Sequence, residues 1–168
     1  MSQQSAPPIV IVTTGGTIDK AYFDALSSYH VGDTVMAKLL SIAQVTYPYR
    51  IVELLRKDSL ELTDADRATL RETVASLETD KVVVTHGTDT MAQSARALMP
   101  VAGKTIVLTG ALSPARFAES DAAFNLGMAF AAVQTLPQGV YITMNGRVIR
   151  GDRARKDREK ARFVSDDD

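Results

Sequence analysis

Short runs of apolar, mostly β-branched residues recur along the chain and are separated by longer, more polar stretches. The runs cover residues 9–13, 49–55, 81–85, 105–110 and 140–144. A short, unbroken apolar run bounded by turn residues is typical of a strand that is buried on both faces of a sheet. The pattern therefore predicts five buried β-strands.

Apolar residues at helical spacing lie between the predicted strands. The clearest stretch is 62–78, where one face of a helix would carry Leu70, Val74 and Leu77. Thr63 stands at the position of an N-cap, and Asp66 follows it three residues later, as in a capping box. Two further helices are predicted over 91–99 and 120–136.

The alternation of strands and helices indicates an α/β domain with a mainly parallel sheet. A length of 168 residues suits a single domain with one main site. Asn145 and Gly146 form a hairpin signal, so we expect the last apolar run to turn back into residues 147–150. From Arg147 onward the chain holds eight Lys/Arg and six Asp/Glu, which predicts a solvated helix or a frayed tail.

The composition excludes several function classes. Hydrophobic residues make up 45%, charged residues 23%, and the net charge is -1, so we expect a globular protein that does not bind nucleic acid. The absence of cysteine and the wide separation of His30 and His86 argue against a metal site. The N-terminus lacks the features of a secretory signal, and no apolar run is long enough to span a membrane. A cytoplasmic protein is expected.

Ligands of parallel α/β sheets bind beyond the carboxyl ends of the strands, so the residues after each strand are candidates for a site. The turn after the first strand, residues 13–17, has two glycines but fits neither the dinucleotide-binding nor the P-loop spacing. In residues 85–90, Asp89 or Thr90 could cap a helix, or Thr88 and Asp89 could supply a hydroxyl and a carboxylate for catalysis. The turn at 109–114 adds exposed backbone amides.

Two of these stretches, TGGTI (14–18) and THGTDT (85–90), match the two signature sequences of the L-asparaginase family. The match continues in order through KDSLEL (57–62), the segment 109–126 and MNGRVIRGDRARK (144–156). The chain therefore resembles an L-asparaginase over nearly its whole length. The resemblance implies a Rossmann-like three-layer α/β domain like the N-terminal domain of that family.

The resemblance also implies roles for individual residues. Thr17 would be the nucleophile, and Thr88, Asp89 and Lys156 would form a supporting cluster. Lys160 is the alternative to Lys156, because both lie in the same charged run. An alcohol needs a nearby base or proton relay, so we expect the lysine, the aspartate and the second threonine to act as one coupled unit.

Further roles follow from the family pattern. A tyrosine on the loop after the nucleophile would be Tyr22, with Tyr29 as the alternative. Ser59 would bind the α-carboxylate of the substrate, beside the glycine turns at Gly16 and Gly87. The backbone amides of Thr88 and Ala111 are candidates for the oxyanion hole, whereas His86 is expected to be structural.

The chain departs from the family pattern in two places. Full-length members have a second, smaller domain that helps to bind the substrate's α-amino group, and this chain ends soon after the lysine segment. Asp19 and Lys20 replace small residues after the nucleophile, and Asp19 could supply a negative charge for the ammonium group.

The predicted function is that of an amidohydrolase that converts L-asparagine and water to L-aspartate and ammonia through an acyl-threonine, without a cofactor. The alternatives are a glutaminase or other amidase of the same family, and a module that binds an amino acid without hydrolysing it. A homo-oligomer is expected, since the second domain normally helps to assemble the site.

Overall fold

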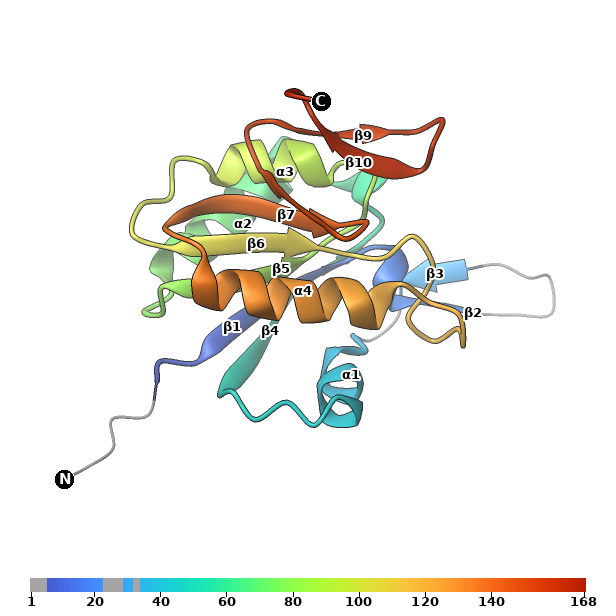
Figure 1. The fold of residues 1–168 in the computed structure, drawn as a ribbon, viewed down its shortest axis with the longest axis horizontal. Coiled ribbons are helices and arrows are strands. Elements are labelled where there is room, and N and C mark those ends of the chain that lie inside the picture. The colour runs from blue at the N-terminus through green and yellow to red at the C-terminus, as the bar shows by residue number, and fades with distance from the viewer. Residues whose placement is uncertain (1–5, 23–28, 32–33) are drawn as a thin grey trace.

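The computed structural model describes residues 6–22, 29–31 and 34–168, and a six-stranded sheet lies at its centre (Figure 1). The strands of this sheet are β1 (Ile9–Gly15), β4 (Tyr49–Lys57), β5 (Lys81–Thr85), β6 (Thr105–Thr109), β7 (Gly139–Met144) and β8 (Arg147–Arg150). They lie in the order β4-β1-β5-β6-β7-β8, and only the pairing of β8 with β7 is antiparallel. The predicted mainly parallel sheet is confirmed.

Helices cover both faces of the sheet (Figure 1). On one face lie α2 (Asp64–Ser76) and α3 (Met91–Leu98), and on the other lie α1 (Met36–Ile42) and α4 (Ala122–Thr135). The three helices expected from the sequence are α2, α3 and α4, and the result is the predicted three-layer α/β domain. Within the described ranges, no helix is both long and apolar enough to cross a membrane.

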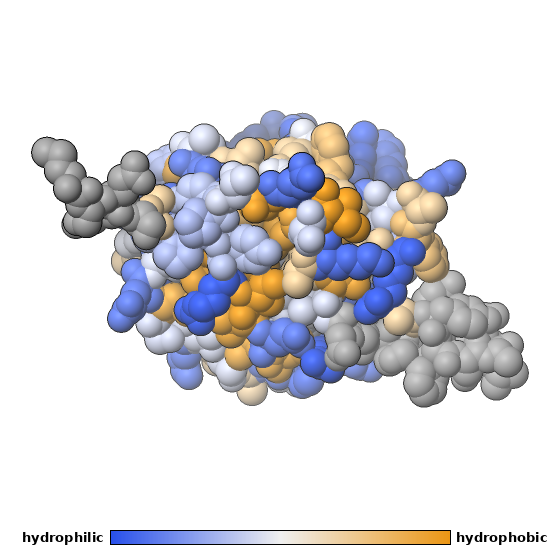
Figure 2. Space-filling view, turned by 90° about the horizontal axis from the view of Figure 1, so that it is seen from below, coloured by the Kyte–Doolittle hydropathy of each residue, from blue (hydrophilic) through white to orange (hydrophobic). Residues whose placement is uncertain are grey.

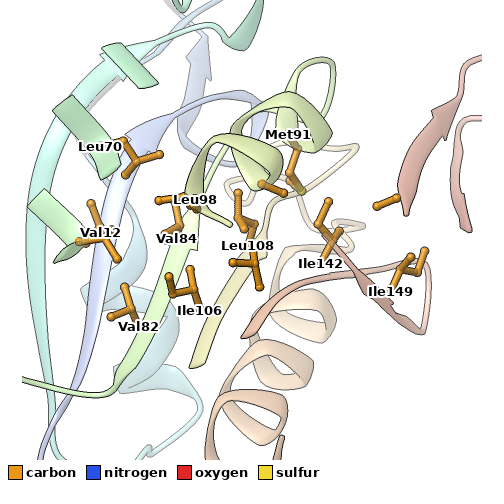
Figure 3. Close-up of a cluster of buried hydrophobic side chains, with 14 of the residues drawn as sticks. Val12, Leu70, Val82, Val84, Met91, Leu98, Ile106, Leu108, Ile142 and Ile149 are labelled. Carbon is orange, nitrogen blue, oxygen red and sulfur yellow. The ribbon is translucent and has the colours of Figure 1, made fainter. Parts of the chain in front are cut away.

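The core has two halves because successive residues of a strand point to opposite faces of the sheet. Val12 and Val84 pack beneath α2 and α3, whereas Ile11 and Val83 pack beneath α1 and α4. Figure 3 shows the first half, where side chains of the strands meet those of the helices. Burying one aliphatic side chain is worth roughly 1.5–3 kcal/mol, so strands with apolar residues on both faces stabilise both layers.

β4 is the one predicted strand that is not buried. All of its residues are exposed or half-buried, and Tyr49 is 36% exposed. The physical reason is its place at the end of the strand order, where it has β1 on one side. An apolar run alone does not distinguish an edge strand from a central one.

The prediction for the charged C-terminal segment is wrong. Instead of a helix or a frayed tail it forms an antiparallel hairpin of β9 (Ala154–Asp157) and β10 (Arg162–Ser165). Ala154, Phe163 and Val164 are buried, and the first two join the core on the α3 side. Arg96 of α3 also donates a hydrogen bond of 2.9 Å to the Ala154 carbonyl. A few well-placed apolar side chains therefore outweigh the high density of charge.

Two local signals in the sequence are confirmed. Asn145 and Gly146 have φ of 54° and 71°, the left-handed pair of a type I′ turn, and they join β7 to β8. At the start of α2, Thr63 Oγ1 accepts a hydrogen bond of 3.2 Å from the Asp66 amide. The Asp66 carboxylate accepts one of 2.8 Å from the Thr63 amide, which completes the capping box.

Several short elements were not predicted. They are α1, the antiparallel pair of β2 (Lys20–Tyr22) and β3 (Tyr29–Val31), and the 3-10 turns η1 (Thr17–Asp19) and η2 (Ser59–Glu61). Elements of three to seven residues are too short to show a clear hydrophobic period. Two of them, η1 and η2, directly follow strands of the sheet.

We predict that Thr63→Ala lowers the free energy of unfolding by about 1 kcal/mol, because it removes the side chain that caps α2. Thr69→Ala is a matched control: Thr69 is exposed in the same helix, and its hydroxyl only bonds back to the Ala65 carbonyl. Urea denaturation should show a loss for the first variant and none for the second. Equal losses would contradict the capping role.

Candidate active site

The neighbouring strands β4, β1 and β5 end at the same edge of the sheet, and predicted site residues follow each of them. Gly16 and Thr17 follow β1, Ser59 follows β4, and residues 87–89 follow β5. Ligands of parallel sheets bind beyond this edge. The topology thus gathers residues from distant parts of the sequence into one candidate active site.

The turns after β1, β4 and β5 pack together through glycine. A Cβ atom on Gly16 would overlap the backbone nitrogen of Gly87, and one on Gly87 would lie 2.5 Å from the Cβ of Ser59. Gly16 also has φ of 87°, a conformation that suits glycine. Thr17 and Thr88 each directly follow one of these glycines, so the contact between the two backbones brings the two threonine segments together.

Lys156 reaches this site from the C-terminal hairpin. Its Nζ lies 2.8 Å from Thr88 Oγ1 and 2.8 Å from Asp89 Oδ1. The Lys156 side chain is 15% exposed and that of Asp89 is 36% exposed, so the ion pair lies at the boundary with solvent. Lys160 lies in the turn of the same hairpin, where its amide donates to Asp157. Of the two candidate lysines, Lys156 is the one that joins the threonine and the aspartate.

The helix-capping alternative for residues 89–90 receives no support from the hydrogen bonds. Thr90 occupies the N-cap position of α3 without a capping bond from its side chain. Its hydroxyl instead donates a hydrogen bond of 2.7 Å to the Ser59 carbonyl. Ser59, the first residue of η2, is 2% exposed, and this hydrogen bond ties it to the turn after β5.

The segment after Thr17 leads into the β2–β3 pair, where the backbone of Tyr22 lies opposite that of Tyr29. The side chains of both tyrosines lie outside the described structure, so the choice between them stays open. Lys20 forms an ion pair of 2.8 Å with Asp58 and so connects the turns after β1 and β4.

Asp19 is buried, with 1% of its surface exposed, and its Oδ1 accepts a hydrogen bond of 2.8 Å from the Val35 amide. The structure therefore shows this carboxylate as an anchor for the segment that enters α1. Burial raises the pKa of Asp19 to about 6, although the hydrogen bond from Val35 opposes the rise. A contact of Asp19 with a substrate ammonium group stays a prediction.

Ala111 lies in the turn after β6 and is buried. The preceding carbonyl, that of Gly110, accepts a hydrogen bond of 2.9 Å from Asn125 Nδ2. Asp121 accepts hydrogen bonds of 3.0 Å from the amides of residues 112 and 113, and Asn125 bonds to Asp121 as well. Two side chains of the α4 segment thus hold the turn that carries the Ala111 amide.

His86 is completely buried behind the site and forms a chain of hydrogen bonds. Its Nδ1 lies 2.7 Å from the Gly87 carbonyl oxygen, and its Nε2 lies 2.7 Å from Ser94 Oγ. Arg67 donates a hydrogen bond of 3.2 Å from Nε to the same hydroxyl. Burial lowers the pKa of His86 to about 4.

Sequence reasoning missed Arg67, Ser94, Asp121 and Asn125 as supporting residues. Asn125 carried a usable signal, because it is a lone amide within the apolar stretch 122–133. No signal in the sequence marked Arg67 and Ser94, since both are ordinary polar residues of helices. Only the packing of α2 against α3 shows that they point inward.

A comparison with known protein families identifies the domain. The family model described as "Asparaginase, N-terminal" matches residues 8–163. The chain belongs to the asparaginase family. Among curated relatives, the glutaminase-asparaginase of Pseudomonas aeruginosa is 33% identical, and the alignment covers 92% of this chain and 46% of that protein.

Solved asparaginase structures share the fold. The thermostable L-asparaginase from Thermococcus kodakarensis has a TM-score of 0.81 and 27% identity, covering 95% of this chain and 51% of that chain. L-asparaginase I from Vibrio cholerae has a TM-score of 0.82 and 29% identity, with coverage of 95% and 52%. The chain spans about half the length of the curated asparaginases it matches.

We predict that Gly16→Ala destabilises this asparaginase domain by at least about 3 kcal/mol, since it adds left-handed strain and an overlap with the Gly87 backbone. Gly103→Ala is the matched control, because Gly103 has φ of 74° but no atom within 4 Å of the added Cβ. For Gly103→Ala, the free energy of unfolding should fall by only about 1–2 kcal/mol. Similar losses in urea denaturation would show that the two backbones have room to separate.

We predict that Asp19→Asn stabilises the domain above pH 6 and has little effect below pH 4. A carboxyl group whose pKa rises from 3.8 to about 6 on folding stabilises the protein while protonated, and this contribution is lost as the pH rises through 6. The amide cannot ionise and can still accept the hydrogen bond from Val35, so the gain reaches up to about 3 kcal/mol.

Melting temperatures of wild type and Asp19→Asn between pH 4 and 8 check this prediction. His86 has the opposite pH dependence, because its lowered pKa means that stability is lost as the pH falls below 6.5. Both proteins contain His86, so this effect cancels in their difference. Glu72→Gln, at an exposed position of α2, controls for loss of a carboxylate and should run parallel to wild type. A constant offset for Asp19→Asn would exclude the buried ionisation.

Proposed function

We propose that residues 1–168 form a single catalytic domain of an amidohydrolase that converts L-asparagine and water to L-aspartate and ammonia. The observation that carries this proposal is the contact of Lys156 with Thr88 and Asp89, beside the turn that holds Thr17. Membership of the asparaginase family supports the same reaction, and the relatives described above are named for it.

In the proposed mechanism the Thr17 hydroxyl attacks the side-chain amide carbon of asparagine. The proton of the Thr17 hydroxyl passes to the amide nitrogen, the C–N bond breaks and ammonia leaves, and water then hydrolyses the acyl-threonine ester to release aspartate. Lys156, Thr88 and Asp89 act as the coupled unit that moves the protons, since an alcohol needs such a relay at neutral pH. These steps need no cofactor.

The remaining site residues would bind and enclose the substrate. Ser59 would bind the α-carboxylate, beside the turns that pack together at Gly16 and Gly87. The Ala111 amide, with the amide that follows Gly87, would stabilise the oxyanion. Tyr22 would close the site over the substrate.

L-Glutamine is the second candidate substrate. The relative from Pseudomonas aeruginosa is named for both amides, which favours testing both. The two substrates differ by one methylene, a difference worth only about 1–3 kcal/mol in most pockets. The same cluster of Thr88, Asp89 and Lys156 serves either reaction.

Assembly into a homo-oligomer is part of the proposal. A groove of about 70 Å³ between α1 and α4 is lined mainly by apolar side chains, among them Leu39, Val45 and Phe130. Figure 2 views this side of the molecule and shows hydrophobic surface between polar residues. Ile42 and Phe124, on the same two helices, are 69% and 63% exposed. A second copy of the chain would remove such surface from water.

The test is ammonia release from L-asparagine and L-glutamine by the purified chain. We expect activity that is abolished by Thr17→Ala and falls by about 10²–10⁴-fold in Lys156→Met, because that variant has no amine for proton transfer. Lys160→Met is the matched control and should hydrolyse asparagine like wild type. Light scattering on the same samples measures the molecular mass.

Each part of the proposal has its own contrary result. Hydrolysis that survives Thr17→Ala would exclude the acyl-threonine, and asparagine binding without turnover would favour a binding module. Equal losses in the two lysine variants would remove the specific role of Lys156. Unchanged asparagine affinity in Asp19→Asn would exclude the ammonium contact, and a monomeric mass would exclude the homo-oligomer.

A further inference from the structure

The peptide unit between Gly87 and Thr88 is held at its carbonyl oxygen by a hydrogen bond from His86. The Gly87 carbonyl oxygen lies 2.7 Å from His86 Nδ1, in the interior of the protein. The described residues contain no cis peptide bond, and in a trans peptide the carbonyl and the next N–H point in opposite directions. The Thr88 N–H is therefore directed away from His86.

The Thr88 amide has no acceptor among the residues that the structure describes. Thr88 is only 5% exposed, and a backbone donor without a partner is rare at such a position. Its hydroxyl meets Lys156, so the residue lies at the centre of the proposed site. An unpaired amide at this place is suited to receive the oxygen on which charge develops during amide hydrolysis.

The hydrogen bonds around His86 also define its tautomer. A carbonyl oxygen only accepts, so Nδ1 carries the proton and donates it to Gly87. Nε2 then accepts from the Ser94 hydroxyl, which in turn accepts from Arg67. Each donor in this chain faces an acceptor, so the ring has one orientation and one protonation pattern.

We propose that His86 is a positioning residue, which holds the Gly87–Thr88 peptide so that the Thr88 amide points at the carbonyl oxygen of the substrate. Ser94 and Arg67 keep the ring in place from behind. This inference rests on the proposed amidohydrolase function and adds to it a cause for the direction of one oxyanion donor. His86 itself touches neither the substrate nor the nucleophile.

Two conservative substitutions separate positioning from packing. In His86→Asn the amide nitrogen occupies the place of Nδ1 and can still donate to the Gly87 carbonyl. In His86→Gln the amide group extends to the place of Nε2, near Ser94, and does not serve Gly87. Gln fills more of the buried volume, so packing alone predicts that His86→Gln is the less damaged of the two.

We expect the opposite order for catalysis. His86→Gln should lose about tenfold or more in kcat for asparagine with little change in KM, because the interaction is made mainly in the transition state. His86→Asn should keep most of the wild-type kcat, even where it melts at a lower temperature than His86→Gln. Val84→Ala, a buried cavity variant on β5, is the control and should lower stability with kcat unchanged.

A kcat that follows melting temperature across these variants would overturn the proposal. The Thr88 amide resonance in a proton–nitrogen correlation spectrum gives a second readout that needs no turnover. It should stay near its wild-type position in His86→Asn and move in His86→Gln, and equal displacements in both would also overturn the proposal. A wild type that hydrolyses no amide but shows the expected resonances would count against the amidohydrolase function alone.

Discussion

The contact of Gly16 with Gly87 is the constraint on which the rest of the site depends. It lets the backbones after β1 and β5 touch, with Ser59 filling the space on the other side of Gly87. A side chain at Gly16 would separate these two turns, and one at Gly87 would collide with Ser59. Thr17 and Thr88 follow these glycines directly, so their relative position is set by backbone packing, which is more rigid than packing between flexible side chains.

Behind this contact lies a polar interior that the parallel sheet does not by itself require. His86, Ser94 and Arg67 form one connected set of hydrogen bonds, and Asn125 and Asp121 form another beneath the turn after β6. Buried polar groups cost free energy unless each is satisfied, and satisfied sets favour one arrangement over others. Both sets hold backbone segments at the carboxyl edge of the sheet, which is where the proposed chemistry takes place.

Much of this fold could be predicted from the sequence because its central strands are buried on both faces. Continuous β-branched runs then indicate β1, β5, β6 and β7 directly, and the capping box and the Asn-Gly turn mark their elements through local hydrogen bonding and backbone conformation. The edge position of β4 and the docking of the β9–β10 hairpin depend on contacts between distant residues. A local pattern does not contain that information.

The same distinction applies to the site. The grouping of Thr88, Asp89 and Lys156 was expected from a family resemblance, and the structure brings these three side chains together. The anchoring of Asp19 by Val35 and the direction of the Gly87 carbonyl were not expected, because both depend on how loops lie against buried neighbours. Sequence signals identify the chemical groups, whereas tertiary packing decides where those groups point.

The hairpin that carries Lys156 has a consequence for how the protein is made and how it can fail. Thr17 and Lys156 are 139 positions apart (156 minus 17), so the proposed site joins an early and a late part of the chain. A nascent chain on the ribosome can complete most of the sheet while its lysine is still missing. The hairpin is a sheet of its own, so its opening withdraws Ala154 and Phe163 from the core beside α3 but leaves the six-stranded sheet paired. Loss of the lysine from the site can therefore precede global unfolding, and the temperature of inactivation can lie below the melting temperature.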